Sequence, residues 1–174
     1  MYITKENMQS AFEKLEKTKE QSTIPSWEQL PAIELYMDQV IILLNKYVNT
    51  NIPITQSMVN NYVKLKAVPA PVKKRYGKIH LAYLIIFCTL KQTLSISTIQ
   101  KIMPVDLAEE QVVAVYENFI ENRQKSLNYA SDKVREISKS DDMGNIILQI
   151  SGIANVFKML TEDIASEEIK DEKK

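Results

Sequence analysis

Glycine, proline, cysteine and histidine are scarce in this chain, and each shortage excludes something. Three Gly and six Pro in 174 residues leave few positions for tight turns, so the sequence favours long helices. The single cysteine, Cys88, cannot form an internal disulfide, which fits a reducing cytoplasm. The single histidine, His80, is more often structural or merely exposed than catalytic when it stands alone, and a zinc site would need an unusual set of carboxylates.

Glycine-rich phosphate loops of the Walker and Rossmann kinds are also missing. Cys88 falls on the apolar side of an expected helix, which is typical of a packing residue rather than a thiolate nucleophile. We therefore expect a protein that is not an enzyme and that holds no metal and no cofactor.

Long uninterrupted apolar runs are absent too. The first residues, MYITKENMQSAF, lack the apolar core of a signal peptide. The most apolar stretch, IILQISGIANVFKML, is interrupted by Gln149, Asn155 and Lys158. We expect no membrane-spanning segment, no membrane partner and a cytoplasmic location.

Acidic residues are missing from one long stretch. Residues 39–105 contain no Asp or Glu but nine Lys or Arg. Because the whole chain has 22 bases and 22 acids, the remainder carries an excess of nine negative charges. A charge run is often only a solvated surface. In a folded, apolar-rich segment it is also the pattern of a surface that approaches a polyanion.

Apolar spacing predicts three helices in the first 65 residues. The first covers residues 4–20 with Thr4 as its cap and forms an N-terminal arm, residues 1–24. The second begins with Pro31 at its first position and ends near Val48. The third is short, with Thr55 as its N-cap, and ends near Leu65.

Two helices joined by a short turn make a helix-turn-helix pattern when the second one presents polar side chains. Asn and Gln can pair with adenine, and Lys can reach phosphate or guanine. Any surface helix after a turn could carry such residues. Here the polar residues of the third helix are Gln56, Ser57, Asn60, Asn61 and Lys64.

The segment AVPAPVKKRY cannot be helical, because Pro69 and Pro71 restrict themselves and the residues before them to extended geometry. Val68 and Val72 are expected to anchor it to the core, so that the basic residues after them project. A short basic hairpin beside a recognition helix would be a wing that grips the phosphate backbone. The simpler interpretation is a loop that connects two helices.

A helix is expected again from Gly77, and a short helix capped by Ser95 or Ser97 follows it. With these elements placed, the runs ITQSMVNNYVKLKAVPAP, RYGKIHLAYLIIF and LSISTIQKI together resemble the MerR-type winged helix-turn-helix. The positions that match this pattern are Thr55, Val59, Tyr62, Val68, Pro69, Tyr76, Leu81 and Ile96–Ile99.

The resemblance implies a winged helix-turn-helix domain over residues 25–104 that binds double-stranded DNA. The chain departs from the family pattern at Lys66, where Gly is preferred, at Asn60, where Arg is usual, and at His80, where Asp is usual. Its wing is also shorter and lacks the Gly-Tyr-Arg tip. The predicted DNA-binding residues are Thr55, Gln56, Ser57, Asn60, Asn61, Lys64, Lys66, Lys73, Lys74, Arg75, Tyr76 and Lys78.

A closer resemblance covers most of the chain. The run IPSWEQLPAIELYMDQV, with VNNYVKLKAVPAPVKKRYGKIHLAYL, is similar to an uncharacterised bacterial family, domain of unknown function 1836. That resemblance implies no activity.

The sequence predicts long helices in the C-terminal region, residues 105–166, and a charged tail over residues 167–174. More than thirty residues from Asp106 contain no Gly or Pro, and apolar residues recur there at spacings of three and four. This seam could pair with a second chain or with the last helix of its own chain. Its members are Val113, Tyr116, Ile120, Arg123, Leu127, Ala130, Val134 and Ile137.

The sequence therefore predicts a predominantly all-α protein, with a short β-hairpin wing and long C-terminal helices. The expected function is that of a dimeric, DNA-binding transcriptional regulator. The alternative is a non-catalytic protein-interaction module on a helix-turn-helix scaffold. No residue pattern indicates an effector ligand.

Overall fold

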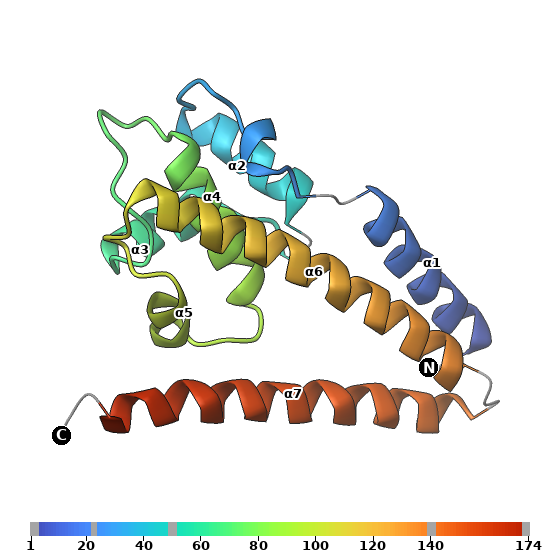
Figure 1. The fold of residues 1–174 in the computed structure, drawn as a ribbon. Coiled ribbons are helices and arrows are strands. Elements are labelled where there is room, and N and C mark those ends of the chain that lie inside the picture. The colour runs from blue at the N-terminus through green and yellow to red at the C-terminus, as the bar shows by residue number, and fades with distance from the viewer. Residues whose placement is uncertain (1–3, 22–23, 49–51, 139–141, 172–174) are drawn as a thin grey trace. The chain divides into compact units, whose positions relative to one another are not determined.

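A computed structural model describes residues 4–21, 24–48, 52–138 and 142–171, and within these ranges the protein is all-α, as predicted. No β-strand occurs in the described ranges; the only β-type pairing there is two isolated bridges. Its α-helices and one short 3-10 helix are, in chain order, α1 (Lys5–Gln21), η1 (Trp27–Gln29), α2 (Met37–Tyr47), α3 (Gln56–Lys64), α4 (Lys78–Leu90), α5 (Ile96–Ile102), α6 (Glu109–Ile137) and α7 (Met143–Asp171) (Figure 1).

The chain divides into two compact units. We call residues 24–121 the head; the other unit, the helical unit, comprises residues 1–23 and 122–174. The head begins at Ile24, and its last residue, Glu121, lies inside α6. The reason is packing, since Val112 and Tyr116 of α6 are buried in the core of the head.

The head is built around α4. Eight consecutive residues of this helix, 81–88, are buried, and a helix that is apolar all round belongs at the centre of a domain. Helices α2 and α3 add Leu44 and Val59 to the same core. The Tyr62 ring of α3 packs on the Phe87 ring of α4, with centroids 4.5 Å apart. Burying these side chains positions α3 on the surface of the head.

The second helix begins six residues later than predicted. Pro31 does not start it, because the chain first makes an isolated bridge in which Leu35 and Tyr76 exchange two backbone hydrogen bonds of 2.9 Å. The Tyr36 N–H is then capped by the side chain of Gln39 (2.9 Å), and α2 follows. The expected end near Val48 is confirmed, since Val48 is the C-cap.

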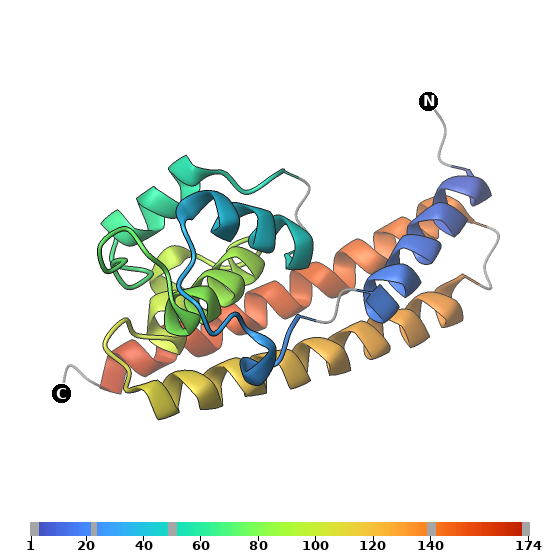
Figure 2. The same cartoon turned by 90° about the horizontal axis from the view of Figure 1, so that it is seen from above.

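In the helical unit, α1 lies along the C-terminal part of α6 (Figures 1 and 2). Glu16 accepts a hydrogen bond from the Ser131 hydroxyl and pairs with Arg135 at 3.4 Å. Arg135 also lies over the Phe12 ring, 5.6 Å from its centroid. The Ser131 hydrogen bond is the main reason that the pKa of Glu16 is lowered. The predicted N-terminal arm is thus docked on α6.

The predicted seam along α6 is used by the chain itself over much of its length. Its first residues pack against the head core, and its last residues face α7. Leu127, which lies between the first and last seam residues in the chain, is half-buried. Nε of Arg123 is buried and has no hydrogen-bond partner in the part of the chain described. Burial also lowers the pKa of the Arg123 guanidinium. The two groups are Val113, Tyr116 and Ile120, and Ala130, Val134 and Ile137.

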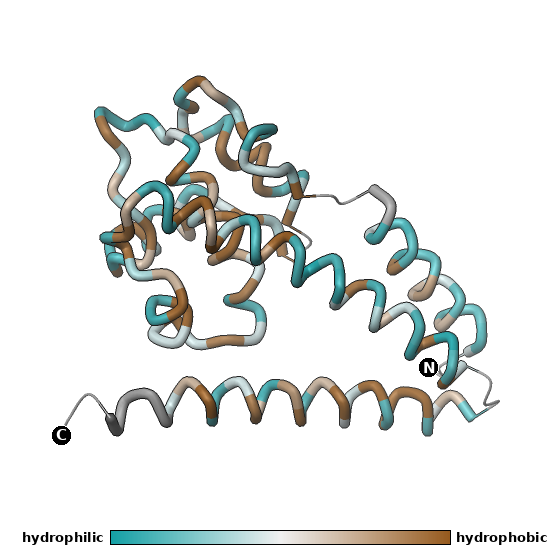
Figure 3. Tube along the Cα trace, in the orientation of Figure 1, coloured by the Kyte–Doolittle hydropathy of each residue, from teal (hydrophilic) through white to brown (hydrophobic). Residues whose placement is uncertain are grey.

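Helix α7 is mostly exposed. Apolar positions, drawn in brown, recur along it (Figure 3). Its segment Met143–Ser166 is long and apolar enough to cross a membrane by length and composition alone. The sequence expectation that no segment meets this criterion is therefore wrong. One such helix is weak evidence for a membrane span, because a mostly buried core helix meets the same criterion; in α7 6% of the apolar window is buried.

Candidate nucleic-acid interface

The turn before α3 is held by one side chain. Nδ2 of Asn45 donates to the Ile54 carbonyl (3.0 Å), and the Ile54 N–H donates to Oδ1 of Asn45 (2.8 Å). The Thr55 hydroxyl then accepts from the Met58 N–H (3.4 Å), which confirms Thr55 as the N-cap of α3. These contacts fix the angle at which α3 leaves α2.

Helix α3 has one buried side and one polar side. Val59 and Tyr62 are buried in the core. The predicted contact residues on the other side are all exposed, and each has a polar side chain that reaches solvent: Gln56, Ser57, Asn60, Asn61 and Lys64. The structure therefore brings the predicted α3 residues together on one surface.

The end of α3 is closed by a lysine in an unusual conformation. Lys66 has a φ of 54°, in the left-handed region that favours glycine. Its N–H donates to the Val63 carbonyl and the Ala67 N–H to the Tyr62 carbonyl, each at 3.0 Å, as in a Schellman cap. The MerR-type pattern prefers Gly at this position, and this chain adopts the left-handed conformation with Lys.

The predicted wing is replaced by a tight turn. Val72 and Arg75 form an isolated bridge, with the Arg75 N–H donating to the Val72 carbonyl at 2.9 Å. Lys73 and Lys74, between them, have φ values of 49° and 62°, the geometry of a type I′ turn. A longer hairpin cannot form on the N-terminal side, because Pro69 and Pro71 have no N–H to donate.

Not every basic or aromatic residue of the segment stays available at the surface. Nη2 of exposed Arg75 donates to the Tyr36 hydroxyl (2.8 Å). Lys78 is paired with Glu28 at 3.9 Å, which ties it to the head. Tyr76 is buried, so its side chain does not reach the surface. Val68 is buried as expected, whereas the expected anchor Val72 is exposed.

Four lysine side chains are exposed to solvent. Lys64, Lys66, Lys73 and Lys74 are exposed, and none of them forms an ion pair with any residue that the structure describes. Figures 1 and 2 both place α3 and the loop after it on the same side of the head. We call this set, with the polar α3 residues and Arg75, the basic head surface.

His80 has a structural role that sequence reasoning did not find. The Gly77 N–H at the start of α4 donates to Nδ1 of His80 (3.1 Å), so Nε2 carries the proton and donates to the Ala70 carbonyl (3.1 Å). The first contact is the one that an acidic residue at the third helical position commonly makes. An Asp at this position could make the same contact.

We expect His80→Ala to lower the free energy of unfolding by about 1–2 kcal/mol, because both contacts are lost. His80→Asp keeps the contact to Gly77 and should recover about half of that loss. Thermal unfolding of the two variants measures the difference. Equal losses would contradict the capping role.

The residues that could carry chemistry are buried or isolated. Burial raises the pKa of the Cys88 thiol to about 12, which keeps it protonated at neutral pH. Among the described residues, no group of His, Cys, Asp and Glu is placed to hold a metal ion.

These observations define a class of protein: an all-α head in which one short, capped helix and the turns after it present polar and basic side chains. The chain belongs to the family described as Domain of unknown function (DUF1836), which matches residues 25–119. Those bounds nearly coincide with the head and, like it, include the first part of α6. Comparisons with curated proteins and with solved structures give no match, so the MerR resemblance stays a prediction.

Proposed function

We propose that the chain binds double-stranded DNA through the basic head surface and acts as a dimeric transcriptional regulator. In this proposal the α3 residues Asn60 and Asn61 face base edges, and the lysines of the following turns contact phosphates. The C-terminal helices join two copies, so that two heads reach one duplex.

The observation that carries the proposal is the position of the strained lysines. In the described residues, the non-glycine residues with positive φ are Lys66, Lys73 and Lys74, and all three belong to the basic head surface. A left-handed conformation costs a residue with a side chain roughly 1–2 kcal/mol. Folding alone favours Gly or Asn at these positions. Lysine there is explained by a demand for positive charge, and strain of this kind gathers at functional sites.

The charge pattern supports the same proposal. The head residues 39–105 contain no acid, so no carboxylate of that stretch opposes an approaching phosphate. The exposed amides of α3 add the donors and acceptors that base edges require.

The test is a fluorescence titration with duplex DNA, read as a function of salt concentration. Each phosphate contact that is lost should reduce the log–log salt slope by about 0.9. Changing Lys73, Lys74 and Arg75 to Ala should therefore flatten the slope by about 3 per head and weaken all duplexes alike, if each contacts one phosphate. Asn60→Ala or Asn61→Ala should leave the slope unchanged and relax preference at one or two base pairs, at a cost of about 1–3 kcal/mol there.

An outcome in which duplex affinity is weak and none of these substitutions changes it would overturn the proposal. The basic head surface would then dock an acidic protein, as in an interaction module. The duplexes should include the upstream region of the protein's own gene.

A further inference from the structure

We infer that the proposed dimer is made by α7: the α7 helix of a second copy lies antiparallel in the groove between α6 and α7. The inference rests on the proposed function in one respect only: the proposed function requires a dimer. Its evidence comes from the helical unit alone, and the test below contains no DNA.

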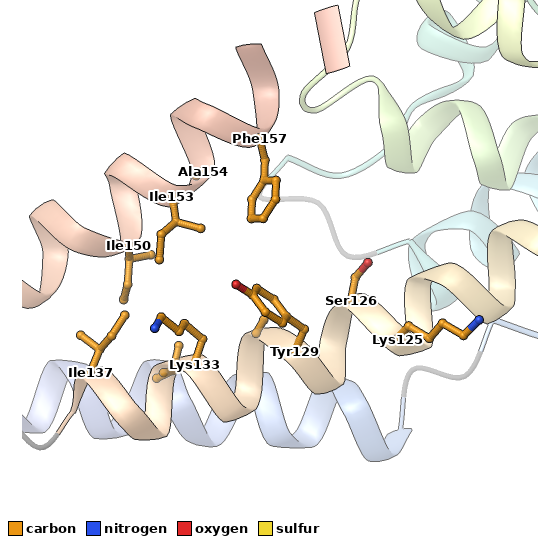
Figure 4. Close-up of a pocket in the computed structure, with 11 residues that line it drawn as sticks. Lys125, Ser126, Tyr129, Lys133, Ile137, Ile150, Ile153, Ala154 and Phe157 are labelled. Carbon is orange, nitrogen blue, oxygen red and sulfur yellow. The ribbon is translucent and has the colours of Figure 1, made fainter. Parts of the chain in front are cut away.

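The groove between α6 and α7 is large and apolar. It has a volume of about 610 Å³. Figure 4 shows Ile137, Ile150, Ile153 and Phe157 directed into the space between the two helices, with Tyr129 beside them. The Tyr129 and Phe157 rings meet edge to face, 6.3 Å apart. The groove leaves apolar side chains in contact with water, so covering it with a second apolar surface would be favourable.

One stripe of α7 provides the matching surface. It consists of six apolar residues at spacings of 4, 3, 4, 3 and 4, a pattern that reads the same in both directions along the helix. Ile146 is 2% exposed and Ile164 is 66% exposed, so the beginning of the stripe is covered more fully than its end. The stripe is Ile146, Ile150, Ile153, Phe157, Leu160 and Ile164.

A twofold axis fixes the register. If Phe157 of one chain packs against Leu160 of the other, Ile153 packs against Ile164 by the same symmetry. Each of these contacts then occurs twice, and the stripe residues from Ile153 to Ile164 are covered in both chains. The buried Ile146 keeps its place beneath its own α6.

The charges around the stripe favour a second copy. The positions that border it on either side are uncharged apart from Asp163, so two copies meet without repulsion along the seam. Lys125 and Lys133 lie at the rim of the groove, and Asp163, which borders the stripe of the incoming helix, brings a charge of opposite sign.

A lipid bilayer fits α7 less well. Ser151, Asn155, Lys158 and Glu162 recur at spacings of three and four, which makes a polar stripe along the side away from the apolar one. Lys158 and Glu162 are paired at 3.9 Å. In a membrane this stripe would lie in hydrocarbon, whereas in a helix bundle it faces water.

The test compares two charge substitutions on α7 by sedimentation of the whole chain. Leu160 is 51% exposed and lies in the stripe, and Leu148 is 73% exposed on the opposite side of the helix. We expect the wild-type chain and Leu148→Asp to be dimeric in the micromolar range. We expect Leu160→Asp to be monomeric with an unchanged circular dichroism spectrum, because its charge would be buried unpaired only in the dimer.

The register is tested by disulfide formation in a Cys88→Ser background. A mixture of Phe157→Cys and Leu160→Cys chains should form the mixed disulfide faster than either chain pairs with itself. A monomeric wild type, or equal effects of the Leu148 and Leu160 substitutions, would overturn the inference. Binding of α7 to phosphatidylcholine vesicles in place of dimerisation would overturn it in favour of a membrane. None of these outcomes depends on duplex affinity, so failure of the DNA proposal remains distinguishable.

Discussion

Replacing Lys73 by Asn and Lys74 by Gly is expected to stabilise the head and to weaken its binding to DNA. The two lysines have left-handed φ values at the centre of a type I′ turn, where Asn-Gly is the favoured pair. Relieving about 1 kcal/mol at each position should raise the free energy of unfolding by about 2 kcal/mol. Loss of two phosphate contacts should flatten the log–log salt slope by about 2 per head.

The control for this prediction is Lys64→Gln. Lys64 is an exposed lysine of α3 with ordinary helical geometry, so its loss removes charge without relieving strain. Duplex affinity should fall, and the urea midpoint should stay where it is. If the Lys73 and Lys74 double variant gained stability while its affinity stayed unchanged, strain and binding would be unrelated, and the main support for the proposed function would be lost.

Lys66→Gly extends the same reasoning to the end of α3. The Schellman cap already has the backbone that glycine prefers, so this change should stabilise the head by about 1 kcal/mol. The salt slope should flatten by about 1. If both variants behave as expected, lysine lowers the stability of the head at three separate positions, and its positive charge is the reason for its presence there.

The extents of most helices follow from local signals. Thr55 and Ser95 cap their helices by accepting from the backbone N–H three residues later, and these contacts need no tertiary information. The buried side of α3 follows from the spacing of Val59 and Tyr62. The polar surface of α3 was therefore predictable from sequence alone.

The features that the sequence did not predict depend on distant partners. The late start of α2 depends on the bridge between Leu35 and Tyr76, which are far apart in the chain. The burial of Tyr76, which removes it from the proposed interface, follows from the same bridge. The strain at Lys66, Lys73 and Lys74 is a property of backbone angles, and only the two prolines and the Gly preferred at position 66 in the MerR-type pattern pointed toward it.

The seam along α6 shows the limit of reading periodicity. A heptad pattern states which side of a helix is apolar, and it does not state what covers that side. Here the first part of the α6 seam packs on the head and the last part faces α7. A second chain at α6 was one of two open interpretations. The exposed stripe of α7 now offers the more accessible surface for it.

Tyr116→Ala should therefore unfold the head rather than simply dissociate a dimer. Tyr116 is 0% exposed, its ring meets Trp27 edge to face at 6.3 Å, and its hydroxyl donates to the Pro25 carbonyl at 2.8 Å. Removing a buried aromatic ring costs about 3–5 kcal/mol. Tyr116→Phe, which loses only the hydrogen bond, should cost about 1 kcal/mol.

Cys88 provides the measurement, because it is the only cysteine and lies in the head core with a pKa of about 12. A thiol reagent should label it only when the head opens, so the labelling rate reports the stability of this unit. We expect labelling to accelerate about a hundredfold or more in Tyr116→Ala, as 3 kcal/mol implies. Leu127→Ala is the matched control, since Leu127 belongs to the same α6 seam but lies in the helical unit. If both variants left Cys88 protected and changed only the sedimentation of the chain, the whole α6 seam would lie between two chains. The packing of α6 on the head would then be wrong.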